Sequence, residues 1–366
     1  MIKHAYIHIP FCVKKCNYCA FCSFPLLRKK EEYLKALIKE IKYFYKGIYK
    51  EERLKTLYFG GGTPSLLEAE DIKKLVDIFS FENNFEITLE MNPYQISFEK
   101  LKAIFNSKVN RLSLGAQTFD DEILKSIGRL HSKKDFLETL KMAKDAGFKN
   151  ISIDLMYGLP NQTMEKWLED LIFAMSLEIE HISLYGLKIE DGTYFKKYPP
   201  KNLPDLDLQA NMYELACKEL KKEFLHYEFS SFAKSEKYFS KHNLSYWQKK
   251  NYFGFGLSAS GYIENKRYTN TFDYKKYILN PKEKNYLELT KKEDIEEEIF
   301  LNLRTSFGLD FEKINKKYDI NIFKMYEDKF EKFLKTGHLK KTNKGVALTL
   351  KGILVSNLVL SEFIDA

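Results

Sequence analysis

The first half of the chain repeats one hydrophobic pattern: a short run of β-branched or aromatic residues, a turn, and then apolar positions at helical spacing. Short apolar runs predict β-strands, and apolar residues three and four positions apart predict amphipathic helices. The predicted strands are residues 5–10, 54–60, 85–92, 111–117, 150–157 and 181–189. The predicted helices are residues 31–45, 68–79, 98–105, 120–127, 133–146 and 164–176, and Gly147 is a typical helix stop after the 133–146 segment.

This alternation of strands and helices predicts one parallel sheet with right-handed crossover connections. Six such units favour an incomplete barrel over a complete one, so we expect an α/β protein built on a partial (βα)6 TIM-like barrel. Catalytic residues of such barrels lie at the C-terminal ends of the strands. Here those ends carry chemically distinctive segments: residues 12–19, residues 60–63, residues 90–93, Gln117 and Asp154.

The second half of the chain has a different pattern. Residues 190–285 are less regular, with a proline-rich break at Pro199, Pro200 and Pro204 and a helical pattern at 208–223. Helical patterns at 293–303, 311–318 and 323–334 then precede a hairpin candidate at 339–349 and a final helix at 350–363. We therefore expect three parts: a barrel with its cysteine loop (1–190), a barrel extension (191–285) and a C-terminal α+β winged-helix-like module (286–366).

Composition narrows the class of partner. Fifty-nine basic and 51 acidic residues give a net charge of +8, and lysine alternates with glutamate along the predicted helices. Such alternation is typical of solvated helix faces. Nucleic-acid binding needs a concentrated basic stripe, which this sequence lacks. The aromatic share of 15% is high and suits a pocket for a flat ligand as well as a core.

Targeting signals and disulfides are not indicated. The N-terminus has no long apolar run, and no segment approaches the roughly 20 apolar residues that span a bilayer. Four of the five cysteines lie between positions 12 and 22, which is not the spacing of a secreted disulfide framework. We expect a cytoplasmic protein whose thiolates stay reduced and available to metal.

Cys12, Cys16 and Cys19 have the spacing C-x3-C-x2-C directly after the first predicted strand. Three thiolates can hold three irons of a 4Fe–4S cubane and leave the fourth iron open. An open iron can chelate the amino and carboxylate groups of S-adenosylmethionine, whose reductive cleavage is chemistry that the cofactor supplies. A structural zinc site with Cys22 as the fourth ligand is the alternative.

A second motif, Tyr58-Phe59-Gly60-Gly61-Gly62-Thr63-Pro64, ends the second predicted strand. Glycines have no Cβ, so their backbone can approach a ligand closely. A glycine run before a helix is by itself consistent with nothing more than a tight turn. Together with the three cysteines, it favours a cofactor loop.

With these two motifs the chain resembles the radical S-adenosylmethionine superfamily, in the branch that contains oxygen-independent coproporphyrinogen III oxidase and its relative, the heme chaperone HemW. The resemblance covers nearly the whole chain, from Tyr6 to the C-terminal module. It implies the partial barrel of that superfamily, a 4Fe–4S cluster on Cys12, Cys16 and Cys19, and S-adenosylmethionine as cofactor.

The resemblance also implies roles for individual residues. Tyr6 stacks near S-adenosylmethionine, Tyr18 shields the cluster, and Glu90 contacts the methionine end of the cofactor, which is lined by Gly61, Gly62 and Thr63. Three further residues match family motifs and serve, in the oxidase, largely a second S-adenosylmethionine: Gln117, Arg129 and Asp154.

Two of these positions have ordinary structural alternatives. Glu90 is also consistent with a buried partner of Arg111 or Arg129, and Asp154 with a satisfied carboxylate at a strand end.

Three departures from the oxidase pattern favour the chaperone. Eleven residues precede Cys12, fewer than the oxidase has, and Phe21 stands where the oxidase carries a cysteine. Residues 242–247 match the H-N-x-x-Y-W motif of the heme chaperones. The resemblance thus implies delivery of heme to apoproteins, with apo-hemoproteins at the membrane as acceptors. The alternative is radical decarboxylation of two coproporphyrinogen propionates to vinyl groups, so whether the protein is an enzyme stays open.

His242 is the candidate heme ligand in that motif. A neutral imidazole is a common axial ligand for heme iron. Tyr246 and Trp247 offer flat apolar surface, and Lys249 and Lys250 are suited to propionates. A structural histidine among packed aromatic residues is the alternative. Outside these motifs, His8 is expected to be structural or to support the cluster, and Cys217 to be a buried apolar residue.

Overall fold

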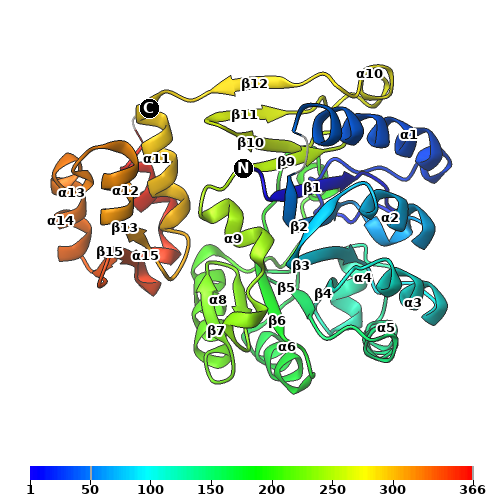
Figure 1. Cartoon of the computed structure of the whole chain (residues 1–366). Helices are drawn as coiled ribbons and strands as arrows, with labels where there is room; N and C mark the ends of the chain where they lie inside the picture. Colours follow the sequence, from blue (N-terminus) through cyan, green and yellow to red (C-terminus); the bar gives the residue numbers. More distant parts are fainter. Residues whose placement is uncertain (50–51, 365–366) are drawn as a thin grey trace.

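The computed structural model describes residues 1–49 and 52–364, and within them one large sheet organises the molecule (Figure 1). Its strands lie in the order β12-β11-β10-β9-β1-β2-β3-β4-β5-β6-β8-β7. The central strands pair in parallel: β1 (His4–Ile9), β2 (Arg53–Gly61), β3 (Ser80–Met91), β4 (Arg111–Gln117), β5 (Ile151–Tyr157) and β6 (His181–Gly186). None of the described helices is long and apolar enough to cross a lipid bilayer.

Helices connect these parallel strands, as the alternating pattern predicts. They are α1 (Lys30–Ile41), α2 (Ala69–Val76), α3 (Phe98–Asn106), α4 (Asp121–Ser126) with α5 (Lys133–Ala146), and α6 (Met164–Ser176). Short 3-10 turns precede α1 and α2, at Leu27–Lys29 and Pro64–Leu66. The expected α/β class with six parallel βα units is confirmed. The helix expected at 31–45 continues past α1 as a π-helical segment, Lys42–Ile48.

Side chains of the parallel strands alternate between two environments, because successive strand residues point to opposite faces. Ile7, Leu57 and Leu89 are fully buried and belong to one hydrophobic core with residues of the helices. The alternate positions carry polar or aromatic residues that lie beside one another on neighbouring strands, such as Tyr6 opposite Tyr58. The inner face of the strands is therefore polar, and the outer face packs against the helices.

Residues 190–285, expected to be less regular, extend the sheet at both edges. Beyond β6 lie β8 (Ser231–Ala233) and β7 (Leu225–Glu228), and beyond β1 lie β9 (Tyr252–Phe255), β10 (Ser260–Ile263), β11 (Lys266–Thr269) and β12 (Asn285–Glu288). The helices here are α7 (Tyr194–Lys197), α8 (Leu206–Leu220), α9 (Lys241–Trp247) and α10 (Tyr274–Leu279), with a 3-10 turn at Glu236–Tyr238. Strands this short leave little periodicity, and their partners lie far away in the chain, as in the pairing of His4 with Tyr252.

The C-terminal residues form a second core of their own. Its helices are α11 (Lys291–Asn302), α12 (Phe311–Tyr318), α13 (Ile322–Met325), α14 (Glu327–Lys335), α15 (Leu350–Leu354) and α16 (Ser356–Ser361). A small antiparallel sheet joins β13 (Leu309–Asp310), β15 (Gly345–Leu348) and β14 (Leu339–Lys341). Helices, a hairpin and further helices thus follow in the predicted order, and the helices expected at 323–334 and 350–363 are each divided in two. The boundaries at 190 and 285 stay a prediction.

Candidate functional site

A cavity of about 480 Å³ opens at the C-terminal ends of the parallel strands. Cavities of this size suit a small-molecule ligand. Ten of the residues singled out from the sequence line it: Cys12, Cys16, Tyr18, Cys19, Gly61, Gly62, Glu90, Gln117, Arg129 and Asp154. The tertiary structure thus brings the cysteine loop, the glycine loop and the strand ends around one space.

The three cysteines lie on the loop that follows β1. Cys12 is buried, whereas Cys16 and Cys19 are partly exposed. Thr63 Oγ1 donates to Cys12 Sγ at 3.6 Å, and Arg129 Nη1 donates to Cys16 Sγ at 3.7 Å. Burial raises the pKa of the Cys12 and Cys19 thiols. Metal coordination deprotonates such thiols, so a bound metal and these two donors would favour the thiolates.

Hydrogen bonds from the backbone and from the Asn17 side chain hold the cysteine loop against the barrel. Asn17 N donates to Ile127 O at 3.0 Å, and Asn17 Nδ2 donates to Ser126 O at 3.0 Å, which ties the loop to the end of α4. Phe24 N donates to Pro10 O at 2.9 Å, where the loop returns to β1. The middle of the loop and its return to β1 are therefore both fixed relative to the barrel.

The donor set fits a cubane better than a zinc ion. Among the described residues, no group of three or more histidine, cysteine, aspartate or glutamate side chains is arranged to hold a single metal ion. Cys22 does not line the cavity, but packs against the hydrophobic core. A cubane requires only that each of three thiolates reach a separate iron, and Cys12, Cys16 and Cys19 face one cavity.

The glycine loop lies directly against the cysteine loop. Gly62 N donates to Ile9 O at 2.8 Å, and a Cβ on Gly62 would lie 2.6 Å from Phe11 O and 3.0 Å from Cys12 Sγ. At Gly61 the backbone has φ +114°, and a Cβ there would lie 2.5 Å from the His8 ring. Glycine is needed at both positions because a side chain would collide with other parts of the protein. This reason stands beside the one expected from the sequence, the close approach of a ligand to the backbone.

Glu90 is held at the centre of the site. Its carboxylate accepts from Tyr58 Oη at 2.8 Å and from Gly61 N at 3.1 Å. Burial raises its pKa to about 7. Arg129 instead donates to Asn92 and to the Gly115 carbonyl, so Glu90 serves the glycine loop rather than this arginine.

The far wall of the cavity is formed by β4 and β5. Asp154 accepts from Ser113 Oγ at 3.2 and 3.3 Å, and burial raises its pKa to about 6. Gln117 ends β4 with φ +68°, beside a register shift between β4 and β5. Left-handed backbone in a residue other than glycine costs on the order of 1–3 kcal/mol and is concentrated at functional sites.

Two of the sequence candidates lie behind the cavity wall rather than in it. Tyr6 stacks on Tyr58 with ring centroids 6.1 Å apart, and its hydroxyl is 3.0 Å from His8 Nδ1. His8 Nε2 in turn lies 2.8 Å from the Cys22 carbonyl, so His8 contacts the cysteine loop. Thr63 contacts Cys12 from the side, so Tyr6 and Thr63 support the residues that line the cavity.

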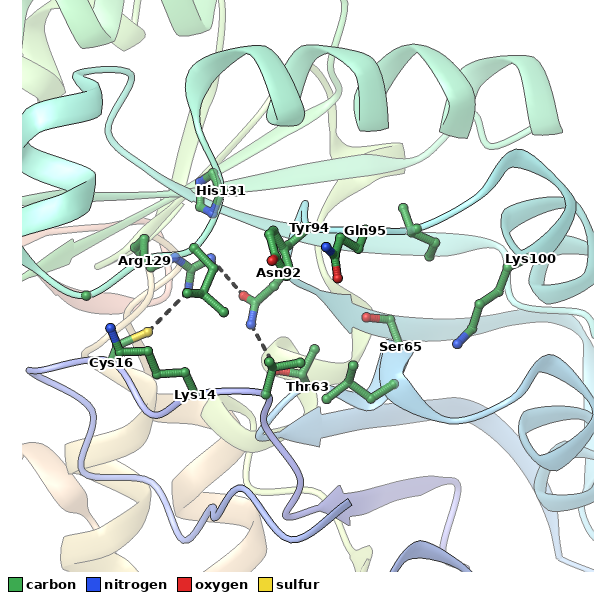
Figure 2. A pocket seen from close by; sticks show the side chains of 15 residues that line it. Lys14, Cys16, Thr63, Ser65, Asn92, Tyr94, Gln95, Lys100, Arg129 and His131 are labelled. Carbon is green, nitrogen blue, oxygen red and sulfur yellow. Dashed lines mark hydrogen bonds between the residues drawn. The ribbon is translucent and has the colours of Figure 1, made fainter. Parts of the chain in front are cut away.

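Thr63 belongs to a smaller pocket of about 70 Å³ beside the main cavity (Figure 2). There Asn92 Nδ2 donates to Thr63 Oγ1 at 2.9 Å, and Arg129 Nη2 donates to Asn92 Oδ1 at 2.7 Å. Asn92 lies in the segment 90–93 that the sequence analysis placed at a strand end, but sequence reasoning assigned it no role of its own. The available signal was its position just after β3, beside Glu90.

The structure does not bring His242 to the cavity. His242 is 1% exposed, with Nδ1 2.7 Å from Thr56 Oγ1 and Nε2 2.7 Å from Tyr246 Oη. Both ring nitrogens are engaged, which argues against the expected role as a heme ligand in this conformation. Lys249 is likewise buried and donates to Asp294, so it is not placed for a propionate.

A cysteine loop and a glycine loop at the C-terminal mouth of a parallel partial barrel are the features of radical S-adenosylmethionine proteins, and the family model of the radical SAM superfamily matches residues 6–174. The model of the HemN C-terminal domain matches residues 289–355. Within this superfamily the chain belongs to the family of the heme chaperone HemW. Membership in the superfamily implies a 4Fe–4S cluster and S-adenosylmethionine.

Curated relatives match over most or nearly all of the chain. The heme chaperone HemW of Bacillus subtilis (strain 168) is 38% identical over 99% of both chains. HemW of Lactococcus lactis is 37% identical over 98% of this chain and 97% of its own. HemW of Escherichia coli (strain K12) is 36% identical over 70% of this chain and 69% of its own.

Among solved structures, coproporphyrinogen III oxidase (HemN) from Escherichia coli aligns with a TM-score of 0.86 at 23% identity. The alignment covers 99% of this chain and 90% of the oxidase. It shows that the two proteins share a fold.

Proposed function

We propose that this protein is a heme chaperone, which binds heme and delivers it to apoproteins. The observation that carries the proposal is the similarity to HemW proteins along essentially the whole chain, at 38% identity over 99% of both sequences. Oxygen-independent coproporphyrinogen III oxidation is the alternative, because that enzyme shares the fold.

The cavity supports a specific arrangement of the cofactors. Cys12, Cys16 and Cys19 would hold three irons of the cluster, and Gly61 and Glu90 line the same cavity, where they would meet the cofactor. When bound, the cluster supplies the electron that can cleave the sulfonium of S-adenosylmethionine. Glu90 accepts hydrogen bonds from donors of the cofactor, and its bond from Gly61 N fixes where that carboxylate lies.

Other residues of the cavity complete the proposed cofactor contacts. Gly61 and Gly62 bring backbone close to the ligand, with Thr63 behind them, and Tyr18 covers the cluster. Across the cavity, Gln117, Arg129 and Asp154 provide polar contacts to the remainder of the cofactor or to a second molecule of it.

The rim of the cavity supports heme at the mouth of the barrel. Phe21 and Tyr185 are 67% and 45% exposed and offer flat surface for a macrocycle. Lys14, Lys15 and Lys188 line the same mouth and offer cations for two propionates. A heme there would lie over the cluster loop. We further propose that the protein acts in the cytoplasm, where its charge of +8 favours contact with anionic membranes that carry apo-hemoproteins.

Heme transfer to an apoprotein tests the proposal. Anaerobically reconstituted protein, titrated with hemin and passed through a desalting column, is expected to retain about one heme per chain and to release it to apomyoglobin. Phe21→Ser and Lys188→Glu should weaken retention, whereas Ile172→Ser, at an exposed position on α6, should not.

The same reconstituted protein tests the alternative function, the oxidation of coproporphyrinogen III. With coproporphyrinogen III, S-adenosylmethionine and reductant, we expect no protoporphyrinogen above a control without protein. Steady formation of protoporphyrinogen, or no retention of heme, would overturn the chaperone function.

A further inference from the structure

The short helix α9, which carries His242, lies between the parallel strands and α11 of the C-terminal module (Figure 1). Its first turn is fixed by Glu86 of β3, which accepts from Lys241 N at 3.2 Å and from His242 N at 3.1 Å. Because Glu86 pairs with Thr56 and Thr56 with the first residue of β1, this contact lies toward the N-terminal ends of the strands. The helix therefore closes the end of the barrel opposite the cavity.

From this position the His242 ring reaches into the barrel. It stacks on the Tyr58 ring with centroids 5.0 Å apart and an interplanar angle of 26°. Tyr6 stacks on the Tyr58 ring at 6.1 Å and 24°. Tyr58 therefore contacts an aromatic ring from β1 and an imidazole from α9, which restrict how its own ring can turn.

Tyr58 carries this constraint to the cofactor site. Its hydroxyl donates to Glu90 Oε1 at 2.8 Å, and Glu90 Oε2 accepts from Gly61 N at 3.1 Å. One ring contact and two hydrogen bonds thus connect His242 with the glycine loop. A displaced Tyr58 ring would leave Glu90 with the Gly61 bond alone and free to adopt another rotamer.

The other end of α9 is fixed to the C-terminal module. Lys249 Nζ donates to Asp294 of α11 and is 3.2 Å from Glu297 Oε2. Asp294 also accepts from Tyr262 and Tyr318. Lys249 follows the H-N-x-x-Y-W segment by two residues, so the segment lies between this buried ion pair and the Tyr58 ring, which in turn contacts Glu90.

We infer that His242 is a positioning residue for the S-adenosylmethionine site, acting through Tyr58 on Glu90, and is not an axial ligand of heme. This inference rests on the proposed placement of S-adenosylmethionine at Glu90 and Gly61. A positioning role is compatible with the burial of His242. Both of its ring nitrogens are hydrogen-bonded and only 1% of its surface is exposed, so the ring has no nitrogen available to bind heme iron.

Cofactor binding by the cluster-loaded full chain tests the inference. S-adenosylmethionine affinity is measured by calorimetry, and its effect on the reduced cluster by electron paramagnetic resonance. His242→Ala is expected to weaken binding about tenfold, the loss that corresponds to one net hydrogen bond. His242→Phe should restore most of the affinity because it restores a ring against Tyr58.

Two further variants separate positioning from loss of stability. Tyr58→Phe removes the bond to Glu90 while keeping the stacked ring, so it should weaken binding as His242→Ala does, and the double variant should lose little more. His226→Ala removes another imidazole, stacked on Phe232 at 4.2 Å outside this connection, and should leave affinity and spectrum unchanged.

The results for these variants decide between a positioning role, a heme-ligand role and a wrong placement of the cofactor. Unchanged affinity in folded His242→Ala and Tyr58→Phe would overturn the positioning role, and so would an altered heme spectrum in His242→Ala with normal cofactor binding. If His242→Ala does not fold, the comparison of His242→Phe with Tyr58→Phe decides: equal losses in both contradict the ring contact. Failure of the wild-type protein to bind S-adenosylmethionine would instead contradict the proposed site.

Discussion

Cys12 and Cys16, two of the proposed cluster ligands, are connected by a chain of hydrogen bonds through Thr63, Asn92 and Arg129. Thr63 donates to Cys12, Asn92 to Thr63, and Arg129 to both Asn92 and Cys16. Donors to a cluster sulfur stabilise its negative charge and tune the potential of the iron. We therefore expect Thr63, Asn92 and Arg129 to tune the potential of a cluster held by these cysteines, although they bind no metal themselves.

The iron content of the reconstituted protein tests whether Cys12, Cys16 and Cys19 are the cluster ligands. Reconstituted wild-type protein should carry about four irons and four sulfides per chain. Cys12→Ala, Cys16→Ala and Cys19→Ala should each abolish the cluster, because a cubane with an open iron has no thiolate to spare. Cys22→Ala and Cys217→Ala are the matched controls and should retain it. Stoichiometric zinc, or loss of iron in Cys22→Ala, would reject the assignment.

The buried carboxylate of Glu90 predicts a pH dependence of cofactor binding. Burial raises its pKa from 4.5 to about 7, so in this interval the folded chain binds more protons than the unfolded chain. The stability contributed by Glu90 therefore falls as pH rises from about 4.5 to about 7. Because an ionised carboxylate accepts hydrogen bonds more strongly, S-adenosylmethionine affinity should rise over the upper part of this interval.

Calorimetry in two buffers with different ionisation enthalpies would measure the accompanying proton release. In Glu90→Gln the affinity should be roughly tenfold or more lower at about pH 7.5, with a flatter pH profile. A profile that is equally steep in this variant would assign the titration elsewhere, with Asp154, whose pKa is about 6, as the next group to test.

At the scale of secondary-structure elements, helix α5 shows that helix bounds can be predicted from the residues of the helix and its caps. Ser132 caps it with a capping box to Asp135, and Gly147 ends it with φ +113°. The pattern of residues 133–146 gave the same bounds. Capping and periodicity involve neighbours within one or two turns, which is why such an element can be predicted from its own segment.

Gly147→Ala should destabilise the protein by about 1–2 kcal/mol or more, because an L-residue is strained in left-handed backbone. A Cβ there would also lie 3.1 Å from the Phe105 ring. Gly192→Ala is the matched control, since Gly192 has φ +77° and nothing within 4 Å of the added Cβ. Urea denaturation should show the larger loss in Gly147→Ala; equal losses would mean that the Phe105 contact relaxes without cost.

At the scale of the whole molecule, a buried ion pair joins the barrel to the C-terminal module. Lys249, whose ammonium is fully buried, contacts Asp294 and Glu297 of α11. Burial raises the pKa of Asp294, but hydrogen bonds from Lys249, Tyr318 and Tyr262 outweigh this and lower it below its ordinary value. The charge on Asp294 is thus maintained by residues from both parts of the molecule.

Removing one partner of this pair should cost more than removing both. Lys249→Met leaves a buried carboxylate uncompensated and should reduce the free energy of unfolding by about 3–5 kcal/mol. Lys249→Met with Asp294→Asn should recover part of the loss. Lys73→Met breaks the exposed pair with Asp77 and should change the melting temperature little. Equal melting temperatures for all three variants would contradict a role of the pair in holding the two parts together.

The sequence by itself determined the parallel βα units, their helices and the positions of the cysteine loop and the glycine loop, which we assign to the cofactors. Each of these rests on residues close together in the chain: a short strand-like run in β4, apolar residues three and four positions apart in α6, and the spacing of Cys12, Cys16 and Cys19. The rule that catalytic residues lie at strand ends then placed Glu90 and Gln117 in one region, because parallel strands present the same end to one side. Asp154 was expected at a strand end but lies in the middle of β5, from where its side chain still lines the same cavity.

Only the tertiary structure decided where residues 190–285 belong and what His242 contacts. The strands there are short and pair across long stretches of chain, β9 with β1 and β8 with β6. His242 looked like a ligand because its neighbours in sequence are aromatic, whereas Thr56, Tyr58 and Glu86 surround it only after folding. Hydrogen bonds and ring contacts between distant segments leave no period in the sequence, so the fold alone fixes which polar groups are satisfied and which remain free for a ligand.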